Sequence, residues 1–243
     1  MEKPNTFMGK HIKHIFLSPH MDDAVLSAGS RIIQLKEQNE HIRVITIFTT
    51  FINGSTTWDT KKYLIKSHAL NTTLFEKKRT EEDIRAMNRL QVDFLHLSYI
   101  DAGFRKTSKN NHAYSNYLEL FSGNLIPDDV LLMEKISKDI KNLLHPTDII
   151  YAPIAIGNHA DHILINRIAK SLSNTTYFWL DQPYAYDHTE TPKKSSYHKA
   201  FTVPFVPKKE SILSQYRSQI KQLYPKGIPA LDEQFYIVTS PGK

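Results

Sequence analysis

The sequence predicts an α/β fold in which a mainly parallel sheet lies between two layers of helices. Two observations carry this prediction. Short apolar runs alternate along the chain with segments of helical periodicity, and the clearest strand candidate, IRVITIFTT at residues 42–50, is rich in β-branched side chains. Alternation of this kind is typical of parallel strands joined by crossover helices. The length of 243 residues suits one large domain.

The first elements follow that alternation. Residues 14–18 form a short apolar run that we expect to be a strand, and residues 22–37 carry apolar side chains at mostly helical spacing. The strand at 42–50 comes next, and Asn53-Gly54 marks a turn after it.

Two helices and a strand precede a long polar segment. We expect helices at 62–69 and at 80–90, the second with acidic residues in its first turn, and a strand at 92–97. Residues 104–126 are polar and show no period, which indicates a long loop. Long loops in compact domains are often functional.

The remaining chain continues the pattern. Helices are expected at residues 128–144, 162–172 and 208–223. Strands are expected at residues 148–154, 177–180 and 235–239. The segment DIIYAPI at 148–154 is apolar throughout, as expected of a buried parallel strand.

Composition excludes several classes of site and partner. The chain has no cysteine, so disulfides and thiolate metal sites are excluded. The apolar stretches are too short for a transmembrane helix, and residues 1–14 lack the apolar core of a signal peptide, so we expect a cytoplasmic protein. The net charge of +6 comes from scattered basic pairs without a nucleic-acid-binding motif, which indicates a solvated basic surface and no nucleic-acid partner.

The stretch SPHMDD at residues 18–23 directly follows the first strand. His20 and Asp23 are three residues apart, so the first turn of a helix can aim both at one point. The positive end of that helix favours ionised carboxylates. N-capping would explain one of the carboxylates, but it explains Asp22, Asp23 and His20 together less well.

A second polar stretch, GNHADH at residues 157–162, follows the strand at 148–154. His159 and His162 are again three residues apart. Taken alone, this pair is explained equally well by a helix start capped by Asp161 with two exposed imidazoles. Because ligands in parallel sheets bind beyond the carboxyl ends of the strands, we expect SPHMDD, GNHADH and the Asp101 region to converge.

Together the two stretches form a coherent metal site. His20, Asp23 and His162 would supply two imidazoles and one carboxylate, and three protein ligands leave a position open for water, as in catalytic zinc sites. The same donors also suit iron or manganese.

The remaining residues of these stretches take separate roles in that site. A metal lowers the pKa of bound water from about 15.7 toward about 7. Asp22 is then free to act as the general base. His159 would donate to the oxyanion, and Asp161 would orient His159 and favour its protonated form.

The segment SPHMDDAVLSAGS resembles the signature of the PIG-L/LmbE-like deacetylase family, whose members share P-H-x-D-D near the N-terminus and a downstream H-x-x-H. The resemblance implies a Rossmann-like fold and the zinc-dependent removal of N-acetyl groups from amino sugars such as N-acetylglucosamine conjugates. It also implies metal ligation by His20, Asp23 and His162, with Asp22 as the base and His159 stabilising the tetrahedral intermediate.

Shorter matches extend the resemblance over most of residues 12–185. Arg79-x-x-Glu82 resembles an R-x-x-E helix start whose arginine reaches the substrate. LHLSYIDAG resembles a segment that points to Asp101, and FWLDQPYA resembles one that points to Asp181 and Tyr184, all as substrate contacts.

The chain departs from the family pattern near its first motif. Ala28-Gly29-Ser30 stands where many members have C-G-G or G-G-G. Met21 replaces a common proline. Residues 186–243 match no pattern, and we expect residues 185–243 to form a substrate-facing cap that determines substrate identity together with residues 104–126.

The sequence therefore predicts a zinc-dependent N-deacetylase that releases acetate from a small-molecule N-acetylated sugar. One alternative is a metal-dependent hydrolase of another N-acylated small molecule, such as an acylated antibiotic, a thiol-conjugate sugar or a lipid-linked sugar. A non-catalytic sugar-binding module would predict a missing base or ligand. A dinucleotide enzyme is disfavoured because neither G-x-G-x-x-G nor G-x-x-x-x-G-K-[ST] is present. The oligomeric state stays open, and a homo-oligomer is compatible with the sequence.

Overall fold

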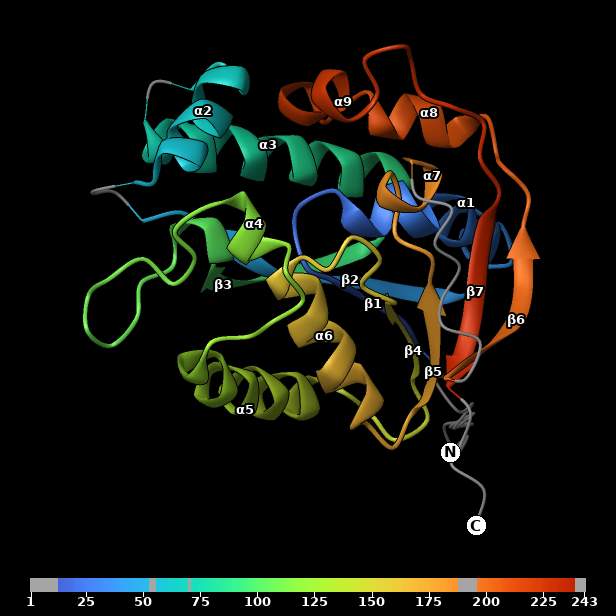
Figure 1. Ribbon diagram of the computed structural model, residues 1–243. Coiled ribbons are helices and arrows are strands. Elements are labelled where there is room, and N and C mark those ends of the chain that lie inside the picture. The colour runs from blue at the N-terminus through green and yellow to red at the C-terminus, as the bar shows by residue number, and fades with distance from the viewer. Residues whose placement is uncertain (1–12, 53–55, 70, 188–195, 239–243) are drawn as a thin grey trace, which may run out of the picture.

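A computed structural model describes residues 13–52, 56–69, 71–187 and 196–238. Its centre is a seven-stranded sheet in the order β3-β2-β1-β4-β5-β7-β6 (Figure 1). The strands are β1 (Lys13–Ser18), β2 (His41–Thr50), β3 (Asp93–Ile100), β4 (Ile149–Pro153), β5 (Thr175–Trp179), β6 (Tyr197–Val203) and β7 (Glu233–Val238). The first five pair in parallel, while β7 runs antiparallel to both β5 and β6. The predicted mainly parallel sheet is confirmed.

Helices cover both faces of the sheet (Figure 1). They are α1 (Asp23–Glu37), α2 (Trp58–Lys66), α3 (Thr72–Leu90), α4 (Tyr117–Leu120), α5 (Pro127–Leu143), α6 (Ala160–Lys170), α7 (Tyr184–Asp187), α8 (Lys208–Leu213) and α9 (Arg217–Leu223). Apolar side chains of α1, α3 and α8 pack with Phe16 on one face, and those of α5 and α6 pack with Ile15 and Leu17 on the other. Successive side chains of β1 thus point to opposite faces of the sheet, as expected of a pleated strand.

Several element boundaries differ from those expected. The helix predicted at 80–90 is the second half of α3, which starts at Thr72 because the side chain of Asn71 accepts the Leu74 N–H at 2.9 Å. The helix expected at 62–69 begins earlier, after the N-cap Thr57. The predicted Asn53-Gly54 turn lies outside the described residues.

The C-terminal part differs more. The single helix predicted at 208–223 is broken between α8 and α9, and the edge strand β6 was not expected because most of its side chains are exposed and show no clear apolar alternation. The strands β6 and β7 extend the sheet, and the substrate-facing cap expected of residues 185–243 stays a prediction. Among the described residues, no helix has both the length and the apolar character needed to span a membrane.

Candidate active site

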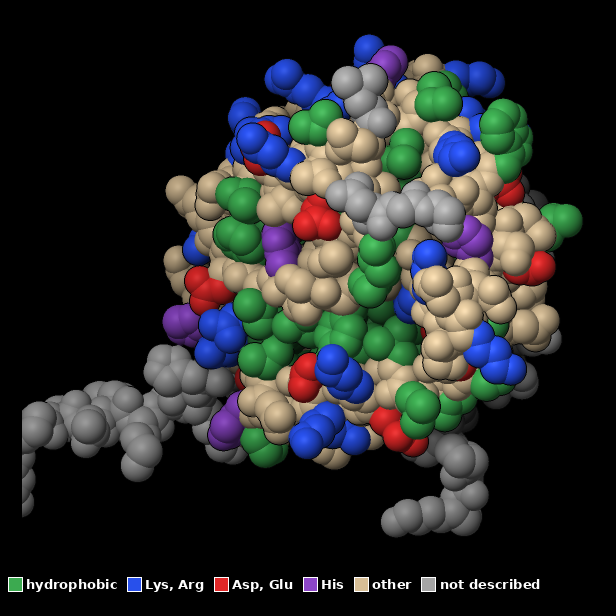
Figure 2. All heavy atoms as spheres, turned by 90° about the vertical axis from the view of Figure 1, so that its left-hand side faces the viewer, with side chains coloured by type: hydrophobic (Ala, Val, Ile, Leu, Met, Phe, Trp, Pro, Cys, Tyr) green, Lys and Arg blue, Asp and Glu red, His purple; other side chains and the backbone are tan. Residues whose placement is uncertain are grey.

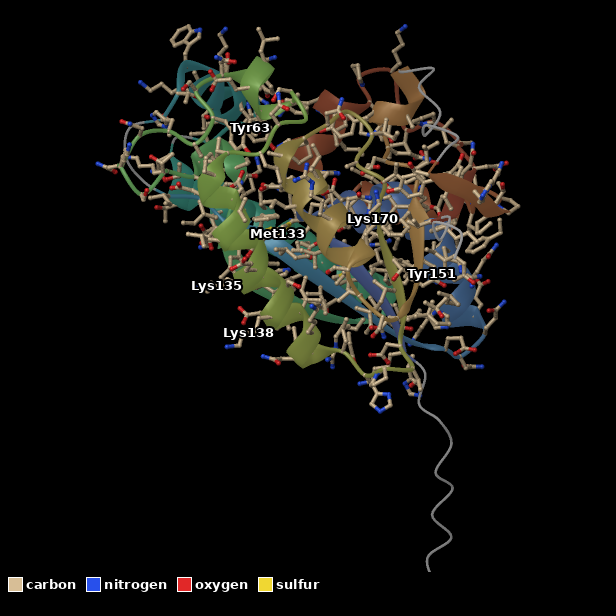
Figure 3. All side chains as sticks on the ribbon, turned by 60° about the horizontal axis from the view of Figure 1, so that its bottom comes forward. Tyr63, Met133, Lys135, Lys138, Tyr151 and Lys170 are labelled. Carbon is tan, nitrogen blue, oxygen red and sulfur yellow. The ribbon has the colours of Figure 1, made fainter. Side chains whose placement is uncertain are left out.

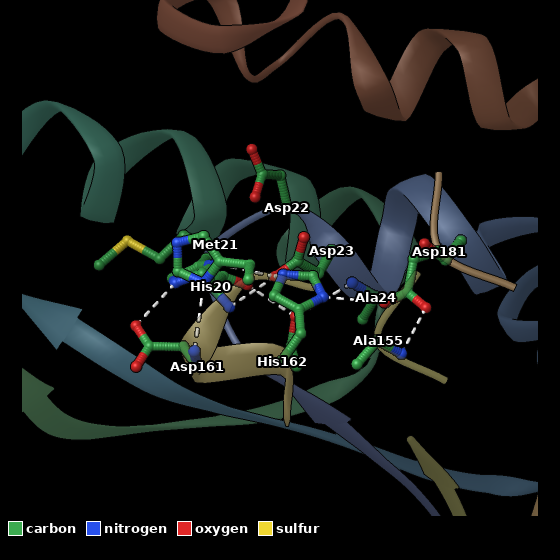
Figure 4. Close-up of polar contacts among 12 residues, drawn as sticks. His20, Met21, Asp22, Asp23, Ala24, Ala155, Asp161, His162 and Asp181 are labelled. Atoms are coloured by element: carbon green, nitrogen blue, oxygen red, sulfur yellow. Dashed lines mark hydrogen bonds and ion pairs between the residues drawn. The ribbon is translucent and has the colours of Figure 1, made fainter. Parts of the chain in front are cut away.

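The polar segments follow the carboxyl ends of four parallel strands and therefore lie at one edge of the sheet. SPHMDD follows β1, Asp101 follows β3, GNHADH lies beyond β4, and Asp181 comes shortly after β5. Because the carboxyl ends of parallel strands share an edge, segments far apart in sequence meet there (Figure 4). The structure thus brings together the segments that the sequence singled out.

Three side chains offer ligand atoms to a common point. Donor atoms of His20, Asp23 and His162 all lie within 4.8 Å of one another. Asp23 Oδ2 is 3.1 Å from His20 Nδ1 and 3.3 Å from His162 Nε2. Two imidazole nitrogens and one carboxylate oxygen at this spacing suit a divalent transition-metal ion.

A buried carboxylate fixes the orientation of His162. Asp181 Oδ1 lies 2.8 Å from His162 Nδ1, while its Oδ2 accepts the backbone N–H groups of Ala155 and Ile156 at 2.8 and 3.0 Å. His162 Nε2 therefore faces Asp23. Burial opposes the protonation of His162, but the carboxylates of Asp23 and Asp181 outweigh it and raise its pKa to about 9.

This arrangement corrects the expectation for Asp181. Its side chain is fully buried, it does not line the pocket described below, and its oxygens are engaged by His162 and two backbone amides. Asp181 therefore supports His162 from behind, in place of the substrate contact that we expected. A carboxylate behind a ligating histidine is the usual way in which metal sites fix the ring.

Asp161 also has a different place from the one expected. Its Oδ1 accepts a hydrogen bond from Arg105 Nη1 at 2.8 Å, and its Oδ2 accepts the Ala102 N–H at 2.9 Å and lies 3.1 Å from His20 Nε2. Burial opposes protonation of His20, but Asp161 and Asp23 raise its pKa well above the ordinary value. The carboxylate of Asp161 thus positions His20, whereas we expected it to position His159.

His159 caps helix α6. Its Nδ1 accepts the backbone N–H of Asp161 at 3.2 Å, so a neutral ring carries its proton on Nε2. Burial, reinforced by the nearby His20, lowers the pKa of His159 well below its usual range. Burial therefore favours the neutral ring, whereas we expected a protonated His159 from the sequence.

His20, His159 and Asp161 form a second group whose donor atoms lie within 4.8 Å of one another. It fits a metal less well than the first group, since the Asp161 carboxylate is already neutralised by the Arg105 guanidinium. Arg105 itself was not singled out from the sequence.

Asp22 occupies the N-cap position of α1 but makes no capping hydrogen bond with its side chain. The hydroxyl of Ser18 accepts the Ala24 N–H instead, at 3.0 Å. Capping therefore does not account for Asp22. Burial raises the pKa of this carboxyl to about 7, with Asp23 adding to the effect and Arg79 opposing it.

A hydrogen-bonded chain leads away from Asp22. Arg79 Nη2 lies 3.3 Å from Asp22 Oδ1 and donates to the Met21 carbonyl at 3.2 Å, while Nη1 donates to the Tyr63 hydroxyl at 3.1 Å. Tyr63 donates in turn to Gln219 Oε1 at 2.6 Å. Tyr63 and Gln219 belong to no motif, so nothing in the sequence pointed to them.

These groups border a cavity of about 230 Å³, which we call the pocket. Its walls include His20, Asp22, Asp23, Arg79, Asp101, His159 and Tyr184. Residues 104–126 contribute Tyr114, Tyr117 and Phe121, and α9 contributes Gln219, Gln222 and Leu223. The loop and part of the C-terminal segment therefore line the pocket, as expected of regions that contact a substrate.

Comparisons with known proteins match most of the chain. The family model described as PIG-L: GlcNAc-PI de-N-acetylase matches residues 15–173, which is more than half of the chain. A 2'-N-acetylparomamine deacetylase from Niallia circulans is 24% identical over 86% of this chain and 82% of its own length. One from Streptomyces fradiae is 26% identical over 70% of this chain, which spans only 57% of that relative. The solved zinc-inhibited form of teicoplanin deacetylase Orf2 is 19% identical, with a TM-score of 0.73 over 95% of this chain and 100% of that one, and shows a shared fold.

Proposed function

Since the chain belongs to the PIG-L family of GlcNAc-PI de-N-acetylases, we propose that it is a metal-dependent hydrolase that removes an N-acetyl group from an amino sugar or sugar conjugate. The single observation that carries the proposal is the meeting of donor atoms from His20, Asp23 and His162 within 4.8 Å, with the carboxylate of Asp22 beside them. A sugar-binding module without catalysis would have no need for this combination.

His20, Asp23 and His162 would hold the metal. Both imidazoles are backed by carboxylates, Asp161 behind His20 and Asp181 behind His162, which supports ligation because such partners fix the ring and raise its basicity. We propose zinc, and iron or manganese suits the same donors. When bound, the ion supplies Lewis acidity toward the acetamide carbonyl and lowers the pKa of a coordinated water.

Asp22 is the proposed general base. It takes a proton from the attacking water and later gives it to the leaving amine, so that one water and one amide yield acetate and a free amino group. A pKa raised by burial to about 7 suits a group that must both accept and release a proton near neutral pH. Arg79 holds the carboxylate in place through its contact with Oδ1.

His159 is the proposed oxyanion donor. With Nδ1 accepting the Asp161 N–H, the neutral ring presents Nε2–H as its hydrogen-bond donor. A donor fixed in place before the reaction stabilises the negative charge that develops on the carbonyl oxygen. The lowered pKa keeps the ring in the neutral form that this role requires.

Substrate contacts fall to Asp101 and Tyr184, together with the aromatic side chains of residues 104–126. The named substrate of the two curated relatives, N-acetylparomamine, supports an acetylated amino sugar carried on a larger glycoside. The cytoplasmic location, the absence of a nucleic-acid partner and the homo-oligomer compatible with the sequence stay predictions.

Acetate release from a panel of N-acetylated compounds tests the proposal. The panel contains N-acetylparomamine, N-acetylglucosamine and an N-acyl amide without a sugar. We expect acetate release from the two N-acetylated sugars and not from the sugar-free amide. After treatment with a chelator, release should require added metal. Turnover of the sugar-free amide alone would favour the broader amidohydrolase alternative, and no turnover by the metal-loaded protein would favour the binding module.

A further inference from the structure

The outer side of the pocket mouth carries large apolar side chains that the fold leaves exposed. Trp58 and Ile65 on α2 are 71% and 72% exposed, and Leu118 on α4 is 85% exposed. Tyr117 N–H donates to Asp59 at 2.9 Å, which joins α4 to α2 at one end of the molecule (Figure 1). Apolar side chains gathered in this way mark interaction surfaces.

Helix α2 has two different faces. Thr60 and Tyr63 turn toward the pocket, and Leu64 is buried. The side chains left exposed on the helix are Trp58, Lys61, Lys62, Ile65 and Lys66. These five, with Leu118, are called the α2–α4 face below. Figure 2 looks onto this end of the molecule, where apolar and basic side chains alternate in the upper half.

We propose that the α2–α4 face docks onto an anionic lipid surface. Tryptophan prefers the boundary between headgroups and acyl chains, and aliphatic neighbours add buried apolar area. Lysines beside them gain from the negative potential of acidic lipids. The Lys62 ammonium lies 5.2 Å from the centre of the Trp58 ring, so the basic and apolar elements are interleaved.

A lipid surface explains this composition better than a second copy of the chain does. A two-fold contact through the α2–α4 face would bring Lys61, Lys62 and Lys66 of both copies together, which like charges disfavour. Acidic phospholipids complement all three.

Docking in this way places α2, which also lines the pocket, at the headgroups. Asp59 and Thr60 line the pocket from the same helix whose other side would meet the lipid. The active site of the proposed deacetylase would then lie beside the lipid surface. That consequence rests on the proposed deacetylase function, whereas docking itself does not.

Tryptophan fluorescence reports on this contact directly. The chain has two tryptophans, and Trp179 is fully buried, so changes on vesicle binding come from Trp58. The whole protein is titrated with vesicles of phosphatidylcholine, with or without phosphatidylglycerol, and sedimented with them. A blue shift and co-sedimentation are expected only with the acidic lipid, and added salt should weaken both.

A charge-matched pair of variants identifies the face. Lys61→Glu/Lys62→Glu should lower the affinity for acidic vesicles at least about tenfold, because each lysine near the membrane contributes to binding. Lys135→Glu/Lys138→Glu changes the net charge equally on α5, at a distance from Tyr63 of α2 (Figure 3), and should change the affinity less than about twofold. Circular dichroism checks that both variants are folded.

The proposal is overturned if acidic vesicles give no shift, if neutral vesicles bind equally, or if both double variants lose binding to the same extent. Sedimentation showing a dimer that Lys61→Glu/Lys62→Glu dissociates, without vesicle binding, would also overturn it. Vesicle binding is scored without substrate. Failure of the deacetylase proposal would instead appear as a lack of acetate release by the unmodified protein.

Discussion

Arg79 and Asp22 form a buried pair, with Nη2 of the guanidinium 3.3 Å from Oδ1 of the carboxylate, and their side chains are 4% and 7% exposed. Removal from water raises the pKa of Asp22, and the guanidinium limits that rise. The pair therefore sets both the position and the proton affinity of the proposed base. Arg79 was expected to contact the substrate, yet its Nη1 and Nη2 donate to Tyr63, Met21 and Asp22.

Replacing Asp22 by Asn should separate catalysis from metal binding. The amide keeps the shape of the side chain but cannot accept the proton, so kcat should fall by about 10²- to 10⁴-fold. Metal content, measured by atomic absorption, should stay near that of the unmodified protein because Asp22 is not a proposed ligand. Near-normal turnover in Asp22→Asn would contradict the assignment of the base.

Replacing Arg79 by Lys tests the hydrogen-bonded chain behind the base. Lysine keeps the positive charge but lacks the planar guanidinium of arginine. Its single ammonium group therefore cannot contact Tyr63 and Asp22 at the same time. We expect kcat to fall about tenfold or more, as when a hydrogen bond to a charged group is lost, with KM changed less. Tyr63→Phe, which removes one hydroxyl from the same chain, should change kcat in the same direction. An increase confined to KM would instead assign Arg79 to substrate binding.

The residues of the site that could be predicted are those whose spacing within a single segment indicated a shared role. His20 and Asp23, and likewise His159 and His162, lie at the starts of helices that follow strands, and the sheet brings such helix starts together. The partners of Asp161 and Asp181 could not be predicted in this way. Each carboxylate binds residues from other segments, and the identity of such partners depends on the path of the folded chain.

The same limit applies to the fold. Alternating apolar runs were sufficient for the parallel strands, of which β1, β2 and β4 are mostly buried. The edge strand β6 has mostly exposed side chains and no such signal. The link from α9 to the base, through Gln219 and Tyr63, joins residues 156 positions apart that share no motif.

Asp181→Asn should weaken metal binding more than it weakens folding. His162 would lose the carboxylate that orients its ring and increases its basicity, and such changes typically cost 10- to 100-fold in metal affinity. Competition with a fluorescent chelator measures that loss. Asp93→Asn, at a side chain that is 74% exposed on β3, is the matched control and should bind metal normally. Equal affinities in the two variants would remove Asp181 from the metal site.

The metal-free protein should lose stability as the pH rises from about 6.5 to about 9. The pKa of His162 is raised to about 9 in the folded state, so its stabilising contribution is complete below the unfolded value of 6.5 and is lost as the pH rises through the folded one. Thermal unfolding of chelator-treated protein across this range measures the effect. His162→Gln should flatten the dependence, and an unchanged slope in that variant would show that another group causes it.

Gly157→Ala should disturb the pocket through Tyr184. The glycine has a φ of +84°, and a Cβ there would lie 2.8 Å from Cγ of the Tyr184 ring, so the ring must move.

Gly227 is the control. Its φ of +103° is also in the region that favours glycine, but a Cβ there would meet nothing within 4 Å. Gly227→Ala should cost about 1–2 kcal/mol of unfolding free energy from backbone strain alone. Gly157→Ala should cost more and also raise KM, because Tyr184 lines the pocket. If both variants unfolded alike and KM stayed unchanged, Tyr184 would have no part in holding the substrate.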